Sequence, residues 1–238
     1  MSSGLIDRMK LRVQSHMKKR MHGTTAGVVG SEMVMVGDIP FPLEITTTKP
    51  LPLIGRGITD IEIHFLQIKH NAIGIYCDES IADHLGNWKG KKERELISDD
   101  CFFDALVSAP VEKYFRVVVI KEIKGAQFGV QIETALRDRL VSADKYEDDE
   151  EAELEKIVEF FQTPYFKKGS VVTFYFPENT PTAEMSYVIE EKDEAKIKVG
   201  NANVAEMIRR WYLGGSIAVS PSTVQSLAEK FETILSSA

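Results

Sequence analysis

The residue types that most often bind metal ions are few in this chain and poorly spaced for the task. Its five histidines, at positions 16, 22, 64, 70 and 84, show no metal-ligand spacing. The two cysteines, Cys77 and Cys101, are too few and too isolated for a zinc site or a disulfide framework. We therefore expect no metal centre and no cofactor, with the histidines at the surface or at the margin of the core.

Three further stretches suggest ion binding, and each has a plainer interpretation. Gly55-Arg-Gly57 lacks the third glycine and the strand-to-helix context of a dinucleotide-binding loop. The acidic run Glu147–Glu151 is either a cation site or, as we favour, the solvated start of a helix. The basic stretch Lys89–Arg94 either meets an acidic partner or forms a solvated loop.

The segment Gly57–Tyr76 has the pattern of a strand beside a binding site, yet it carries no obvious nucleophile. Apolar and polar residues alternate from Ile61 to Phe65, as in a strand with one buried face. After Leu66 the phase of this alternation changes. A strand that changes face bulges or bends, and we expect it to do so across a cleft.

Composition and charge indicate one globular domain. A chain of 238 residues with 43% hydrophobic residues can bury a sizeable core. Its net charge of −7 argues against nucleic-acid binding, which normally needs a basic face. No apolar run reaches the about 18 residues of a membrane span, and the low cysteine content fits a reducing, cytoplasmic location.

The first residues differ from the rest in charge. Residues 1–32 hold six Lys or Arg against Asp7 and Glu32, a local balance of +4 that leaves −11 for the remainder. We expect residues 1–34 to form a disordered basic leader and residues 35–238 to form a single domain. A plastid transit peptide is the alternative for residues 1–32, because such peptides are basic and poor in acidic residues.

Periodicity predicts strands followed by helices, then strands and helices again. Enrichment in Val, Ile and aromatic residues predicts strands at 43–48, 61–69, 72–76, 115–123, 170–176, 184–190 and 196–199. Spacings of three and four predict helices at 80–87, 99–107, 126–142 and 147–161, around 204–211, and from Ser220-Pro221 onward. This order predicts an α+β protein with an antiparallel sheet covered by helices.

An ordered series of motifs resembles the chalcone isomerase family. The series comprises Gly57–Tyr76, Trp88-Lys-Gly-Lys91, Phe102-Phe103 and Ser108-Ala-Pro-Val-Glu-Lys113, and the resemblance runs from about Ile39 to the C-terminus. The chain is most similar to the chalcone-isomerase-like branch called enhancer of flavonoid production. This resemblance implies a large curved antiparallel sheet, a layer of α-helices, and a ligand cleft between them.

The resemblance also allows the family's cleft to be checked by position. Active members use an arginine, a threonine, a tyrosine, an asparagine and a late threonine or serine to bind a polyphenol and stabilise enolate charge. In this chain those positions carry Thr59, Asn71, Phe128, Ala135 and Trp211.

All five positions are changed, and the changes remove catalytic donors. Thr59 has no fixed charge and Phe128 has no hydroxyl, and losing one such donor typically costs about 10²–10³ in rate. Phe128, Ala135 and Trp211 also suit ordinary core packing, with Trp211 narrowing the cleft as well. Asn71 keeps hydrogen-bonding ability, so a chalcone or flavanone ligand in the cleft stays open.

The resemblance therefore implies a non-catalytic auxiliary protein of flavonoid biosynthesis. Its partner would be chalcone synthase, contacted through exposed stretches such as Lys89–Arg94, in the cytoplasm or at the endoplasmic reticulum surface. An active chalcone-flavanone isomerase with an altered site is the first alternative. A fatty-acid-binding protein is the second, although Thr59 and Phe128 remove the arginine and tyrosine that would grip a carboxylate.

Overall fold

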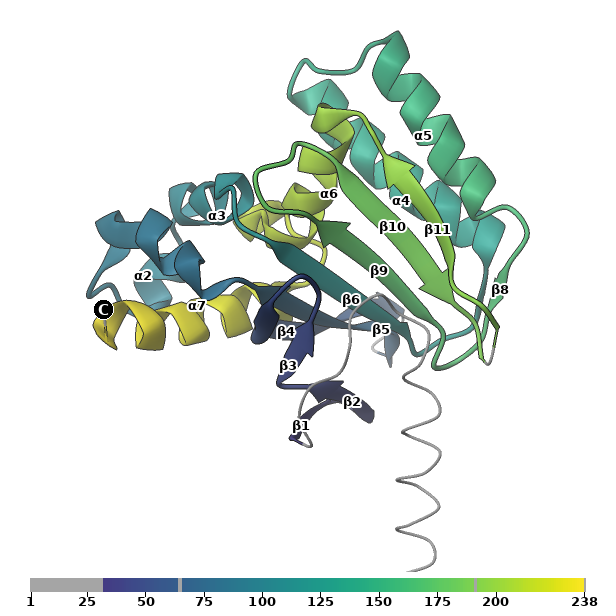
Figure 1. Ribbon diagram of the computed structural model, residues 1–238. Helices are drawn as coiled ribbons and strands as arrows, with labels where there is room; N and C mark the ends of the chain where they lie inside the picture. Colours follow the sequence, from purple (N-terminus) through teal and green to yellow (C-terminus); the bar gives the residue numbers. More distant parts are fainter. Residues whose placement is uncertain (1–31, 64–65, 191, 238) are drawn as a thin grey trace, which may run out of the picture.

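A computed structural model describes residues 32–63, 66–190 and 192–237, and it contains a curved sheet with helices packed on one face (Figure 1). Its main sheet has seven strands in the order β11-β10-β9-β6-β5-β4-β3, and every neighbouring pair is antiparallel. The predicted α+β class and helix-covered antiparallel sheet are confirmed. The strands are β3 (Glu44–Thr46), β4 (Pro50–Ile63), β5 (Leu66–Cys77), β6 (Lys113–Val119), β9 (Val171–Phe176), β10 (Ala183–Val188) and β11 (Ala195–Val199).

Two small ribbons lie outside the main sheet. The strand β1 (Met33–Val36) pairs with β2 (Ile39–Pro42), and β7 (Ile123–Lys124) pairs with β8 (Tyr165–Phe166). The predicted boundary between residues 34 and 35 falls inside β1. Residues 1–31 of the leader expected at 1–34 lie outside the described residues, so that leader stays a prediction.

The helices form in two groups along the chain. The first group is η1 (Glu79–Trp88), α2 (Glu93–Ile97) and α3 (Asp100–Ser108); the later elements are α4 (Gly125–Ser142), α5 (Asp148–Phe160), α6 (Ala202–Leu213), η2 (Gly215–Ile217) and α7 (Pro221–Ser237). On α4, Ile132, Leu136 and Leu140 are all fully buried, as their spacing of four predicts. The acidic start of α5 is a capping box. The side chain of Glu147 accepts the backbone N–H of Glu150, and the side chain of Glu150 accepts the backbone N–H of Glu147.

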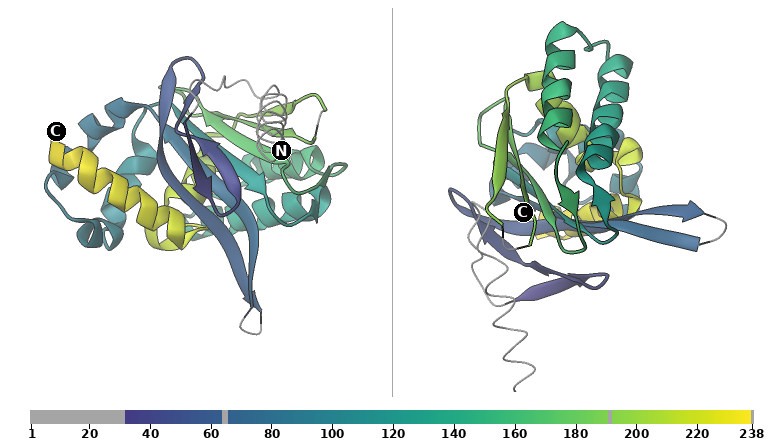
Figure 2. Two further views of the ribbon diagram at one scale, coloured as in Figure 1. Left: turned by 90° about the horizontal axis from the view of Figure 1, so that it is seen from below. Right: turned by 90° about the vertical axis from the view of Figure 1, so that its right-hand side faces the viewer.

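The segment predicted as a strand over 61–69 is in fact two strands. β4 ends at Ile63 and β5 begins at Leu66, and these two residues face each other in an antiparallel pair. The change of phase therefore marks a hairpin, whose residues 64–65 lie outside the described residues. The predicted irregularity exists elsewhere, as a shift of register between Thr59 and Asp60. Figure 2 shows the β4–β5 hairpin projecting beyond the helices.

The sheet has a core on each face. The larger core lies between the sheet and the helices and includes Ile73, Phe115 and Val117 from the central strands. The smaller core lies on the opposite face, where β1 and β2 pack Val36 and Phe41 against the sheet. In Figure 2 the β1–β2 ribbon lies on the side of the sheet away from the helices.

The last helix lies along β4, and hydroxyl groups join the two. Ser226 Oγ accepts the Arg56 backbone N–H at 3.2 Å, and Ser222 Oγ accepts that of Ile58 at 3.0 Å. The helix can approach this closely because β4 carries glycine at positions 55 and 57, where a Cβ atom would collide with α7 side chains.

Among the described residues, no helix is long and apolar enough to cross a membrane.

Candidate functional site

Thr59 and Asn71 lie directly opposite each other on the helix-covered face of the sheet. Thr59 of β4 pairs with Asn71 of β5 in the antiparallel register. Thr59 is two residues from Gly57, which faces α7, and Asn71 is two residues from Ile73 of the larger core. Because side chains alternate along a strand, both residues point toward the helices. The two strand positions implied by the resemblance are therefore brought together.

This pair retains polar groups but carries no charge. The Thr59 Oγ1 atom is buried and has no hydrogen-bond partner among the described residues. Both side chains are half-buried. A hydroxyl and an amide can orient water or a ligand hydroxyl, but neither supplies the positive charge that stabilises an enolate.

Phe128 lies in an aromatic cluster. Its ring centroid is 5.3 Å from those of Phe161 and Phe166, with edge-to-face geometry, and the residue is 4% exposed. Phe160 and Tyr187 extend this cluster. Phe128, for which the resemblance implies a tyrosine in active members, is thus a packed core ring.

Ala135 and Trp211 both lie next to the connection between α6 and α7. The Arg139 guanidinium donates hydrogen bonds to the backbone oxygens of Ala135 and Ile217, at 2.7 and 2.5 Å. The Val219 backbone N–H donates to the Trp211 oxygen at 2.8 Å. Trp211 is half-buried and packs against the larger core, with its ring 5.2 Å from Tyr212. Ala135 lies about 10 Å along α4 from Phe128, since a helix rises 1.5 Å per residue.

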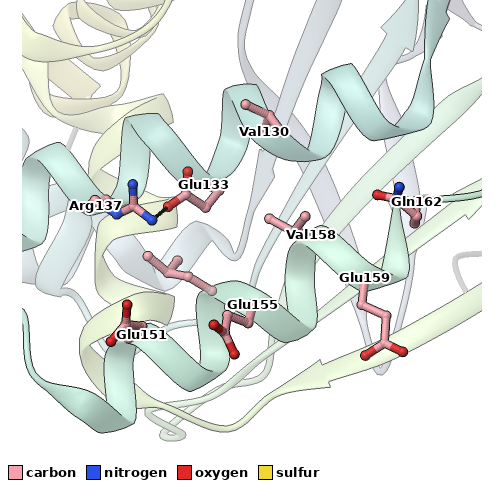
Figure 3. Close-up of a pocket in the computed structure, with 9 residues that line it drawn as sticks. Val130, Glu133, Arg137, Glu151, Glu155, Val158, Glu159 and Gln162 are labelled. Atoms are coloured by element: carbon pink, nitrogen blue, oxygen red, sulfur yellow. Dashed lines mark ion pairs between the residues drawn. The ribbon is translucent and has the colours of Figure 1, made fainter.

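A cavity of about 480 Å³ lies between α4 and α5 (Figure 3). Val130, Leu154 and Val158 supply its apolar surface, while Glu151, Glu155 and Glu159 follow the exposed side of α5. Glu133 forms an ion pair with Arg137 across one helical turn. Three further cavities of the described residues lie near Lys113, Tyr175 and Arg56. None of these four cavities is lined by any of the five cleft positions, Thr59, Asn71, Phe128, Ala135 and Trp211.

Sequence reasoning missed a polar network on the opposite face of the sheet. The buried Glu112 carboxylate accepts hydrogen bonds from the hydroxyls of Thr47, Thr48 and Tyr175, and from the Thr48 backbone N–H. Burial alone would raise the pKa of Glu112, but these hydrogen bonds outweigh it and hold the pKa below its usual value. The network borders a cavity of about 180 Å³. The run of three threonines at 46–48 was the available signal.

The basic stretch Lys89–Arg94 is largely neutralised within the molecule. Lys91 forms an ion pair with Asp99 at 2.8 Å, and Lys92 forms one with Glu232 at 3.1 Å. Hydrogen bonds from Lys91 and Trp88 lower the pKa of Asp99. Arg94 is exposed and forms no side-chain ion pair with a described residue, so it is the best-placed cation in this stretch for a partner.

No cluster of three or more His, Cys, Asp or Glu side chains suited to a metal ion occurs within residues 32–63, 66–190 and 192–237.

Comparison with known proteins assigns the class. The family described as chalcone-flavanone isomerase matches residues 37–234, so the chain belongs to this family. It is 61% identical over 206 residues to chalcone isomerase-like protein 2 of Humulus lupulus, which covers 87% of this chain and 99% of that protein. It is 31% identical to a chalcone–flavanone isomerase of Gentiana triflora, over 85% of this chain and 93% of that protein.

A solved structure supports the fold. The crystal structure of a fatty-acid binding protein of Arabidopsis thaliana aligns with a TM-score of 0.67 over 86% of this chain and 99% of that chain. The sequence identity is 16%, so this likeness concerns the fold alone.

Proposed function

We propose that this chain is a non-catalytic chalcone isomerase-like protein that binds chalcone synthase and promotes chalcone formation. The observation that carries the proposal is its 61% identity to a chalcone isomerase-like protein, against 31% to a named isomerase. Physical support comes from the sites where catalysis would need donors. Thr59 provides no charge there, and Phe128 is a packed ring without a hydroxyl.

Binding to chalcone synthase is tested by co-precipitation of the two full-length proteins and by the product ratio of the synthase. We expect the two proteins to co-precipitate, and the fraction of chalcone relative to lactone by-products to rise when this protein is added. Arg94→Glu tests the basic contact stretch, with Glu155→Lys on the distant helix α5 as the matched charge reversal. An unchanged product ratio together with no co-precipitation would refute the proposal.

The isomerase alternative predicts a different result in a direct assay. We expect this protein to convert naringenin chalcone no faster than the spontaneous reaction, because loss of one preorganised donor already costs about 10²–10³ in rate. Stopped-flow absorbance with chiral analysis of the flavanone measures this. Formation of pure (2S)-flavanone well above the spontaneous rate would show an active enzyme. The double variant Thr59→Arg, Phe128→Tyr is the companion, and we expect it to stay inactive because the Phe128 position is closed by packing.

The fatty-acid alternative has only the likeness of fold behind it. Native mass spectrometry of the purified protein tests it, and co-purified fatty acid would favour it.

A further inference from the structure

Two cations lie at one cavity and have no carboxylate partner within the described part of the chain. This cavity, of about 270 Å³, lies between the C-terminal end of α3, the start of β6, the turn after β9, and α6. Lys113 and Arg209 both line it, and none of its lining residues is acidic. Residues of the motif Ser108–Lys113 line this cavity, and the proposed function assigns no role to that motif.

Lys113 is a buried lysine with no ion pair to a described residue. It is 2% exposed, and its Nζ donates to the backbone oxygens of Ala109 at 2.5 Å and Val111 at 3.4 Å. These two bonds leave one of its three N–H donors unused. Burial lowers the pKa of Lys113 to about 8, and the neighbouring charge of Arg209 acts in the same direction. The lysine still carries most of its charge at pH 7.

The Arg209 guanidinium stacks over the ring of Phe176. Its guanidinium carbon lies 5.3 Å from the centroid of the Phe176 ring, and its Nε is buried without a hydrogen-bond partner. No hydrogen bond or ion pair joins its side chain to any described residue. The nearest carboxylate on its own helix, that of Glu206, is taken by Lys145 and Arg210 at 2.8 Å each.

Two buried cations lower the stability of the folded protein unless a bound anion compensates their charge. Buried charges in proteins are normally paired, because removal from water penalises each of them. An arginine with free N–H groups is suited to a planar carboxylate or a phosphate, which it can bind through two hydrogen bonds. Val107, Val111 and Phe176 add apolar wall beside the two cations. A small pocket with apolar walls and a few convergent polar groups is typical of a metabolite site.

We propose that this cavity binds a small organic anion, with its carboxylate or phosphate group between Lys113 and Arg209 and its apolar body against Phe176. The site is separate from the positions of the family's cleft, and it does not depend on the function proposed above.

Calorimetric titration of the full-length protein at constant ionic strength tests the site. The probes are benzoate, phenyl phosphate and the neutral benzamide, each to about 10 mM, which reaches weak millimolar affinities. We expect at least one anion to bind and benzamide not to bind. Preference for benzoate or for phenyl phosphate identifies the natural anionic group. Failure of both anions, or equal binding of benzamide, overturns the proposal.

Variants separate an anion site from a purely structural role. Arg209→Gln should weaken binding of the anion at least tenfold, whereas the control Arg56→Gln, at an exposed arginine on β4, should change the affinity less than twofold. If Arg209→Gln bound the anion as tightly as the unchanged protein does, the proposed site would be refuted. The variant Lys113→Met tests the other cation of the proposed site independently of Arg209.

Proton uptake supplies a signature that a structural lysine would not give. A bound anion raises the pKa of Lys113, so at pH 8 binding should take up a fraction of a proton, measured in two buffers of different ionisation enthalpy. The facing Cys77 thiol is neutral there, since burial raises its pKa to about 12, and Asp78 is paired with Lys49. Lys113→Met should abolish the uptake. If the unchanged protein bound the anion without taking up protons, Lys113 would not be part of the anion site.

Discussion

Phe128→Ala should lower the free energy of unfolding by about 3–5 kcal/mol, the usual cost of deleting a buried phenylalanine. The ring is 4% exposed and makes edge-to-face contacts with Phe161 and Phe166. Its removal therefore leaves a cavity lined by other rings, which cannot collapse easily. Chemical denaturation followed by tryptophan fluorescence measures the loss.

The matched control for this variant is Val130→Ala, two residues along the same helix. Val130 is 52% exposed, so its truncation should change stability by about 0.5 kcal/mol or less. A small loss for Phe128→Ala as well would mean that the ring borders open space. In that case Phe128 would line a ligand cleft, and its packing would no longer be an argument against catalysis by this chain.

Glu112→Ala should cost at least about 2 kcal/mol at pH 7, because several buried donors lose a charged acceptor at once. The carboxylate holds the segment of Thr47 and Thr48 against Tyr175 of β9. Glu184→Ala is the control, since Glu184 borders the same cavity but makes no side-chain hydrogen bond with a described residue. It should change stability by about 0.5 kcal/mol or less.

The cost of Glu112→Ala should depend on pH. The folded-state pKa of Glu112 is lowered, so its contribution is complete above the unfolded value of about 4.3 and is lost as pH falls through the folded value. The difference between variant and unchanged protein should therefore be larger at pH 7 than at about pH 3. A difference that stays constant with pH would show that the carboxylate is not the group that holds the network together.

The helices were the most predictable part of the fold. Residues such as Leu227 and Phe231 on α7 repeat at intervals of four, and each is fully buried. Strand β2 was not predicted because Pro40 and Pro42 interrupt it, and β1 was not predicted because its first two residues were assigned to the basic leader. Proline has no N–H for a sheet ladder, so its presence argues against a central strand. Here it occurs in a two-stranded ribbon outside the main sheet.

The candidate site was predictable only where a linear motif marked it. The pairing of Thr59 with Asn71 follows from two strands that resemble the family, although the assignment of all five cleft positions stays a prediction. The Glu112 network and the cavity of Lys113 and Arg209 could not be read from the sequence. Their members come from segments as distant as residues 47 and 175, or 113 and 209, and only the folded sheet brings them together.

The serine contacts between α7 and β4 have a consequence for how the protein behaves among its own copies. Over residues 54–63, β4 has no second strand partner among the described residues, so without α7 its outward N–H groups would be free to pair with another chain. Ser222 and Ser226 are about 6 Å apart along the helix, and the amides of Arg56 and Ile58 are about 6.7 Å apart along the strand. Because these two spacings are nearly equal, the helix can take the place of a neighbouring strand beside Arg56 and Ile58. The helix thereby covers this part of the sheet edge, and replacing both serines by alanine would leave the Arg56 and Ile58 amides without these acceptors.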